Sequence, residues 1–168
     1  MDMRSEIDVV IPVFNEASGI QIFHDQLSGV LNGVEKRIRF IYVNDGSTDE
    51  TQARLMEIRQ SDERVVVIEL SRNFGHQAAL SCGIDASDAD WVITMDGDGE
   101  HPPGMIPEML ALAQSGYEVV LAQRLEDQHL VLWRDARVDR DGAHQRRELI
   151  GCERVEERPF DGCSFDTD

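Results

Sequence analysis

Residues 7–16 of the chain read IDVVIPVFNE. The run from Ile7 to Val13 is mostly β-branched and apolar, and it changes abruptly to the polar pair Asn15 and Glu16. A short apolar run of this kind, bounded by turn residues, is typical of a buried strand. We therefore predict a strand over residues 7–13 that opens at its carboxyl end into a polar loop.

The same arrangement recurs as far as residue 124. Further strands are expected at residues 38–43, 65–70, 91–95 and 118–122, each close to the usual strand length. Apolar residues at helical spacing predict helices between them, over residues 20–31, 55–58, 77–86 and 105–113. The sequence STDE at 47–50 predicts a capping box before the second of these helices.

This alternation is the signature of an α/β fold whose sheet is mostly parallel. Right-handed crossovers place the carboxyl ends of parallel strands on one edge of the sheet. Ligands of α/β proteins gather at that edge. The polar residues that follow the strands are therefore the candidate functional residues.

Composition excludes several classes of function. Sixteen lysines and arginines against thirty-three acids give a net charge of −17, which opposes binding to nucleic acid or to an anionic membrane surface. No apolar run approaches the roughly 18–20 residues that span a bilayer, and no signal-peptide pattern precedes residue 7. The three cysteines are too few and too scattered for a disulfide framework or a zinc site. We expect a single globular domain, located in the cytoplasm.

Residues 125–168 differ in character from the rest. They contain many acids and arginines, no lysine and one short apolar run, Leu130 to Trp133. We predict a weakly structured tail here, with a small helical cap around residues 129–150 as the alternative.

The first two strands end in residues that suit a nucleotide. Pro12 removes a backbone donor, and Asn15 and Glu16 present an amide and a carboxylate. Asp45 follows the second strand, where it can accept hydrogen bonds from a base or a ribose hydroxyl. The alternative is that these residues only form turns and that Ser47 caps the next helix. Neither G-x-G-x-x-G nor a P-loop occurs at this junction.

The third strand leads into the loop SRNFGHQ at 71–77. Arg72 can neutralise a phosphate, and Gly75 permits close approach of the backbone to a ligand. His76 is interpreted as a residue at the start of a helix rather than as a metal ligand.

The fourth strand carries the strongest signal, MDGDGEHPP at 95–103. Asp96, Asp98 and Glu100 are carboxylates at alternating positions, separated by glycines. Oxygen-rich ligation of this kind suits Mg²⁺ or Mn²⁺. The alternative is a set of solvated turn acids, although acids held this close without a cation would repel one another.

The segments PVFNE, VNDGSTDET, SRNFGHQAAL and MDGDGEHPP, in this order, resemble the family 2 glycosyltransferases of GT-A fold. The likeness covers residues 7–124 and is strongest to the undecaprenyl-phosphate (bactoprenol) glycosyltransferases, which are bacterial relatives of dolichyl-phosphate mannose synthase. It implies helices on both faces of the sheet. It also implies inverting transfer of a sugar from a UDP- or GDP-linked donor to a polyprenyl phosphate, in synthesis of cell-envelope polysaccharide.

The resemblance also assigns roles by position. It implies that a group of strand-end residues surrounds the base and ribose and that Asp96 and Asp98 are the catalytic, cation-binding acids, with Glu100 as a further ligand. Arg72 and Arg124 would face the phosphates or the sugar. The residues implied around the base and ribose are Pro12, Phe14, Asn15, Glu16 and Asp45.

Two features depart from the family. Glu100 stands where these relatives usually have glutamine. Nothing after Arg124 matches the family's second half, which holds the acceptor site and membrane-associating helices. We therefore expect residues 1–124 to be a donor-binding half and residues 125–168 to be an atypical tail, truncated or frame-shifted. Impaired transfer is expected, with the chain in the cytoplasm or peripheral at the cytoplasmic face of the membrane.

Other readings of the same sheet edge are weaker. A sugar-nucleotide pyrophosphorylase would need a Gly-rich, Arg-containing loop after the first strand, and residues 12–19, PVFNEASG, do not supply one. A phospho-receiver domain would need a lysine at its last strand, whereas Lys36 is the only lysine. A non-catalytic nucleotide-binding fragment stays open as an alternative.

Overall fold

β1 (Ile7–Val13) lies inside the sheet and pairs in parallel with β2 (Ile38–Asn44) on one side and β4 (Trp91–Thr94) on the other. The computed structural model describes residues 6–99, 102–123, 129–134 and 163–165. Within them, β3 (Val65–Leu70) continues the parallel pairing beyond β2. Four adjacent parallel strands, in the order β4-β1-β2-β3, therefore form the centre of the sheet.

Three strands complete the sheet at its sides. β6 (His129–Arg134) lies antiparallel between β4 and β5 (Val119–Gln123), so β5 has the same direction as β4 without touching it. β7 (Cys163–Phe165) pairs antiparallel with β3. The full order is β5-β6-β4-β1-β2-β3-β7.

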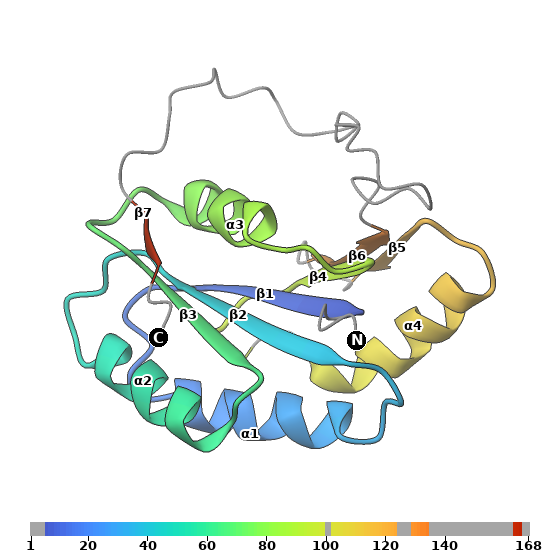
Figure 1. The fold of residues 1–168 in the computed structure, drawn as a ribbon, viewed down its shortest axis with the longest axis horizontal. Helices are drawn as coiled ribbons and strands as arrows, with labels where there is room; N and C mark the ends of the chain where they lie inside the picture. The colour runs from blue at the N-terminus through green and yellow to red at the C-terminus, as the bar shows by residue number, and fades with distance from the viewer. Residues whose placement is uncertain (1–5, 100–101, 124–128, 135–162, 166–168) are drawn as a thin grey trace.

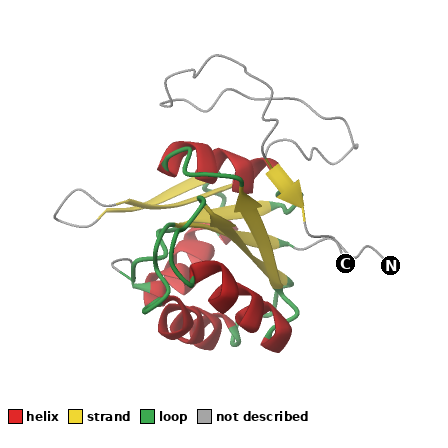
Figure 2. Cartoon of the chain, turned by 90° about the vertical axis from the view of Figure 1, so that its left-hand side faces the viewer, coloured by secondary structure: helices red, strands yellow, loops and turns green. Residues whose placement is uncertain are grey.

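Helices cover both faces of the sheet (Figures 1 and 2). α3 (His76–Asp85) packs on one face, where Val10 of β1 joins Ala79 and Cys82. On the other face, Ile7, Val9, Ile11 and Val13 pack against three helices. Successive strand residues point to opposite faces, so one apolar strand supplies both cores. The three helices are α1 (Ile20–Leu31), α2 (Thr51–Ser61) and α4 (Ile106–Gln114), the last preceded by a 3₁₀ turn, η1 (Pro103–Met105).

The sequence predictions of fold class, of the five strands and of the four helices are confirmed, with ends within a few residues. β6 and β7 were not expected, because they lie in the segment predicted as a tail. The alternative of a helical cap from residue 129 is wrong at its start, since His129–Arg134 is a strand. None of the helices that the structure describes is long and apolar enough to cross a membrane.

Asp8 is a charged residue inside β1, and its side chain is fully buried. It lies opposite Arg39 of β2, which donates from Nε and Nη2 to the two carboxylate oxygens at 3.0 and 2.6 Å. The Ser87 hydroxyl donates to the same carboxylate at 2.7 Å. The charge is therefore compensated by a bidentate cross-strand pair, as burial of a carboxylate requires.

α3 approaches the sheet closely at Gly83. A Cβ at this position would lie 2.4 Å from Cγ1 of Val10 and 2.9 Å from Cγ2 of Val43. A side chain of any size would therefore push the helix away from β1 and β2. Since α3 begins directly after the loop of β3, its distance from the sheet also sets the position of that loop.

We predict that Gly83→Ala lowers the free energy of unfolding by about 1–3 kcal/mol, because an added methyl group overpacks this contact. Gly29→Ala in α1 is the matched control, because a Cβ there meets nothing within 4 Å. The control should raise stability by up to about 1 kcal/mol through helix propensity. Urea unfolding of both variants measures the difference, and equal stability would contradict close packing at Gly83.

Candidate functional site

The candidate site lies where the parallel strands end. From β1 the chain goes to β2 and then to β3 on one side, and it returns to β4 on the other side of β1. The loops that follow β1 and β4 therefore lead away from each other. In open α/β sheets such a switch point leaves a crevice at the carboxyl ends of the strands, where ligands bind.

Three backbone N–H groups of the loop after β1 donate hydrogen bonds to side chains in the loop after β2 and at the start of α2. The N–H of Asn15 donates to Oγ of Ser47 at 2.9 Å, and the N–H of Glu16 donates to Oγ1 of Thr51 at 2.8 Å. The N–H of Ala17 donates to Oδ2 of Asp49 at 3.2 Å.

Asn15 also binds the second loop through its side chain. Its Oδ1 accepts a hydrogen bond from the N–H of Thr48 at 2.8 Å. Asn15 has φ 57°, in the left-handed region that asparagine tolerates better than most residues. The two loops are thus connected by hydrogen bonds, and Asn15 makes two of them.

The loop after β2 contacts the loop after β3 at two successive residues. Asp45 accepts hydrogen bonds from the N–H groups of Phe74 and Gly75, at 2.7 and 2.9 Å. Gly46 has φ 63°, and a Cβ on it would lie 2.3 Å from the carbonyl carbon of Arg72. Glycine is required here, both for the backbone angle and for this contact.

The loop after β3 presents a stacked arginine. The guanidinium carbon of Arg72 lies 4.2 Å from the centre of the Phe74 ring, a cation–π contact, and the side chain is exposed. Gly75 has φ 96° and immediately precedes α3. Arginine in this setting is suited to binding a phosphate.

The loop after β4 is held against β1. A Cβ on Gly97 would lie 2.5 Å from Cγ1 of Val13, so the backbone between Asp96 and Asp98 touches the end of the central strand. Oδ1 of Asp96 lies 3.5 Å from Nε2 of His76, the first residue of α3. Asp98 is exposed.

The pKa of Glu16 indicates that acids from different loops lie near one another. Burial raises the pKa of the Glu16 carboxyl, and the negative charges of Asp98 and Asp49 raise it further. Asp49 itself has a lowered pKa, chiefly because the Thr51 hydroxyl donates to its carboxylate. The structure thus brings Glu16 and Asp98 together across the switch point.

The predicted metal ligands are described in part. Glu100 and Arg124 lie outside the described residues. Among the residues that are described, no three histidine, cysteine or acidic side chains are grouped as a metal site. Asp96 and Asp98 belong to the same loop, so two of the three predicted ligands are placed at the sheet edge.

Several expectations are corrected by the geometry. Asp45 follows β2 where an acid open to a ligand was expected, but only 3% of it is exposed. Ser47 does not cap α2 and STDE does not form a capping box; the Ser47 hydroxyl accepts from the N–H of Asn15 and donates to Asn44 instead. Asp49 accepts from the N–H of Thr51 at 2.9 Å and caps the first turn of that helix.

Sequence reasoning also missed some residues of the site. Phe74, which stacks on Arg72, was not singled out, and Thr51 carries no motif that would have shown its bond to Glu16. His76 was correctly interpreted as a helix-start residue, and its contact with Asp96 was not foreseen. The remaining predicted residues at this edge are the buried Pro12 and the exposed Phe14.

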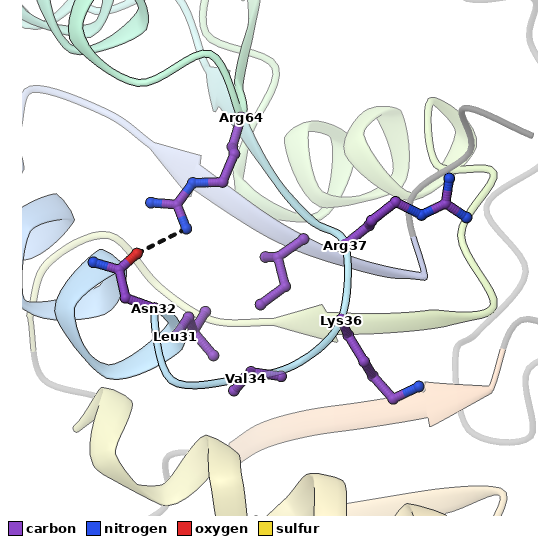
Figure 3. A pocket seen from close by; sticks show the side chains of 7 residues that line it. Leu31, Asn32, Val34, Lys36, Arg37 and Arg64 are labelled. Atoms are coloured by element: carbon purple, nitrogen blue, oxygen red, sulfur yellow. Dashed lines mark hydrogen bonds between the residues drawn. The ribbon is translucent and has the colours of Figure 1, made fainter. Parts of the chain in front are cut away.

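A cavity of about 280 Å³ lies at the opposite edge, beside the starts of β2 and β3 (Figure 3). Two of its cations are already paired: Arg64 donates to Asp62 and to Asn32, and Lys36 lies 3.2 Å from a carboxylate oxygen of Glu6. The polar loops at the carboxyl ends of the strands are therefore the better candidate.

Comparison with known proteins identifies the family of this fold. The family described as Glycosyl transferase family 2 matches residues 8–153. The chain belongs to this family. The match extends beyond Arg124, the last residue that the sequence motifs connected to the family.

Two similar proteins have names that specify a lipid carrier. The chain is 36% identical over 121 residues to the undecaprenyl-phosphate 4-deoxy-4-formamido-L-arabinose transferase of Proteus mirabilis, covering 71% of this chain and 37% of the relative. It is 34% identical over 119 residues to the bactoprenol glucosyl transferase of Shigella phage SfV, covering 71% and 39%. The chain thus spans less than half the length of these relatives.

Two solved structures share the fold. A mannosyltransferase from Pyrobaculum calidifontis in complex with GDP-Man and Mn²⁺ superposes with a TM-score of 0.66 at 17% identity, covering 84% of this chain and 48% of that one. Glucosyl-3-phosphoglycerate synthase from Mycobacterium tuberculosis in complex with UDP has a TM-score of 0.55 at 24% identity, covering 70% and 43%. The GT-A fold expected from the motifs is confirmed.

We predict that Glu16→Gln stabilises the chain at neutral pH. Because the pKa of Glu16 is raised above its ordinary value of 4.5, ionising this group costs more in the folded than in the unfolded state. The gain should be largest above the raised pKa and should vanish well below pH 4.5, where both states bind the proton.

Thermal unfolding of the wild type and Glu16→Gln between pH 5 and 7.5 measures this difference. Glu63→Gln, an exposed glutamate just before β3, is the control and should show no such dependence. A gain that does not change with pH would contradict the electrostatic origin.

Proposed function

We propose that residues 7–124 bind a nucleotide-diphosphate sugar, and that the enzyme containing them transfers the sugar by inversion to a polyprenyl phosphate. The observation that carries this proposal is the joined sheet edge, where the charge of Asp98 acts on the carboxyl of Glu16. Arg72 is exposed in the loop after β3, which belongs to the same edge. A diphosphate needs cationic partners. The similarity to a bactoprenol glucosyl transferase supports the lipid acceptor.

The donor set suits a hard divalent cation. The charge of Asp98 raises the pKa of Glu16, so the acids repel one another where no cation lies between them, and all of their ligand atoms are oxygens. We propose that Asp98 and Asp96 hold Mg²⁺ or Mn²⁺, with Glu100 as a third ligand. When bound, the ion would neutralise the diphosphate as the leaving group.

The other site residues orient the donor in this proposal. Phe14, Asn15 and Glu16 border the base and ribose beside Pro12, with the buried Asp45 supporting the same side. Arg72 and Arg124 contact the phosphates or the sugar, and Gly75 lets the backbone come close. An acceptor phosphate, with a second pKa near about 6, is already largely anionic at pH 7, so a strong general base is not needed.

We also propose that these 168 residues by themselves bind the donor and transfer it slowly. The curated relatives are more than twice as long as the part matched here. Holding the acceptor against the donor carbon can lower a barrier by roughly 7–11 kcal/mol, and the site residues proposed above all serve the donor. On this view the chain is a nucleotide-binding fragment with impaired catalysis.

Nucleotide binding should depend on the metal through Asp98. We expect UDP or GDP to bind more tightly with Mn²⁺ than with chelator, and Asp98→Asn to cost about 1.5–3 kcal/mol of that binding. Calorimetry measures both effects. Asp25→Asn on α1, an exposed aspartate bonded to Gln21, is the matched control and should bind like the wild type. Equal affinity with Mn²⁺ and with chelator would refute the metal role.

Transfer itself is tested with radiolabelled UDP- or GDP-sugar, Mn²⁺ and undecaprenyl phosphate in detergent. We expect little product from the 168-residue chain beside a full-length relative assayed in parallel. Robust turnover that is lost in Asp98→Asn would show that this chain contains a working acceptor site.

A further inference from the structure

A buried histidine, His24, connects α1 to β2 and to the turn between α2 and β3. It is 4% exposed. Its Nδ1 lies 3.0 Å from the hydroxyl of Tyr42 in β2, and its Nε2 lies 3.4 Å from Oδ2 of Asp62, the residue that follows α2. Both ring nitrogens therefore have a polar neighbour, and the two neighbours belong to different elements of the fold.

The Tyr42 hydroxyl determines which protonation state of the ring fits. Tyr42 is fully buried, and burial raises the pKa of its hydroxyl far above the ordinary value, so the group keeps its proton. The hydroxyl can donate to Nδ1 only when that nitrogen carries no hydrogen. The remaining ring hydrogen then lies on Nε2, facing the carboxylate of Asp62. These contacts therefore assign a neutral His24 that is protonated on Nε2.

The carboxylate of Asp62 is already bound by a second cation. Arg64 donates from Nε to Oδ1 at 2.9 Å and from Nη2 to Oδ2 at 2.7 Å, and these bonds lower the pKa of Asp62. Burial lowers the pKa of His24 and outweighs the negative charges of Asp62 and Asp25, while the charge of Arg64 lowers it further. A proton on His24 would therefore be poorly compensated.

Arg64 attaches the same turn to α1 at two more places. Its Nη2 donates to Oγ of Ser28 at 2.6 Å and its Nη1 to Oδ1 of Asn32 at 3.0 Å (Figure 3). The guanidinium lies 5.0 Å from the centre of the Phe40 ring, and the His24 ring meets the same aromatic ring edge-on at 5.3 Å. One polar cluster thus fixes α1 against β2 and the α2–β3 turn.

We infer that His24 makes this attachment acid-sensitive: α1 is held against β2 and the α2–β3 turn while the ring is neutral, and it loosens when the ring takes up a proton. A hydrogen on Nδ1 would face the Tyr42 oxygen, and the hydroxyl hydrogen would lose its acceptor. A buried donor without an acceptor is costly. The inference concerns the fold and does not rest on the proposed function.

The direction of the pH dependence follows from the lowered pKa. As the pH falls, the loosened state, in which water reaches His24, takes up its proton near the ordinary value of 6.5, before the closed state does. The stabilisation by neutral His24 is therefore complete above pH 6.5 and is lost between 6.5 and the lowered pKa. Each pH unit between these two values should raise the loosened population about tenfold.

Native-state hydrogen exchange of the whole chain, followed by NMR between pH 7.5 and 5, tests this inference. Protection factors of the α1 amides should fall as the pH decreases, and those of α3, on the other face of the sheet, should not. The ring C–H signal of His24 should titrate below 6.5. Titration at or above 6.5, or an equal loss of protection in both helices, would overturn the inference.

Two substitutions separate the roles of the ring and the hydroxyl. His24→Gln should abolish the pH dependence of α1 protection, and its persistence would overturn the inference. Tyr42→Phe keeps the aromatic ring and removes the hydroxyl, so the pKa of His24 should rise toward 6.5. Tyr117→Phe, at a tyrosine that is 60% exposed, is the matched control and should leave the His24 titration unchanged. The same titration in Tyr42→Phe as in the wild type would also overturn the inference.

Discussion

The pairing of β1 with parallel strands on both sides is the constraint on which the rest of the structure depends. Its residues supply both cores, because alternate side chains face α3 and the layer of α1, α2 and α4. Asp8 is compensated by Arg39 from the neighbouring strand. Since β2 and β4 flank β1, the chain must reverse its order there, and ligands of open α/β sheets bind at such a reversal.

The loops of this edge form a connected set. Asn15 and Glu16 bind the loop after β2, Asp45 binds the loop after β3, and Gly97 lies against the end of β1. Most of these contacts use backbone N–H groups as donors, so loops without regular structure still have their polar groups satisfied. Such a surface can present acids and an arginine in fixed positions, and fixed groups bind a charged ligand at lower entropic cost.

Prediction from sequence succeeded where a local pattern decides the outcome. The strand at 65–70 and the helix at 20–31 follow from apolar spacing within a few residues, and short connections make the parallel topology the simplest one. Prediction from sequence was incomplete where the outcome depends on hydrogen-bond or strand partners far away in the chain. STDE at 47–50 fits a capping box locally, yet the Ser47 hydroxyl is taken by Asn15 and Asn44. Residues 129–134 form a strand because they pair with both β4 and β5, which do not pair with each other.

The sequence by itself determined the order of strands and helices, the two-faced core and the set of polar residues that meet at one edge, because these depend on side-chain periodicity and chain direction. Only the tertiary structure decided what those residues do there. Asp45 looks like an exposed ligand-binding acid in the sequence, but it is buried because β3 and α3 bring two backbone N–H groups to it. Burial and hydrogen-bond partners come from segments far apart in the chain, and no local pattern records them.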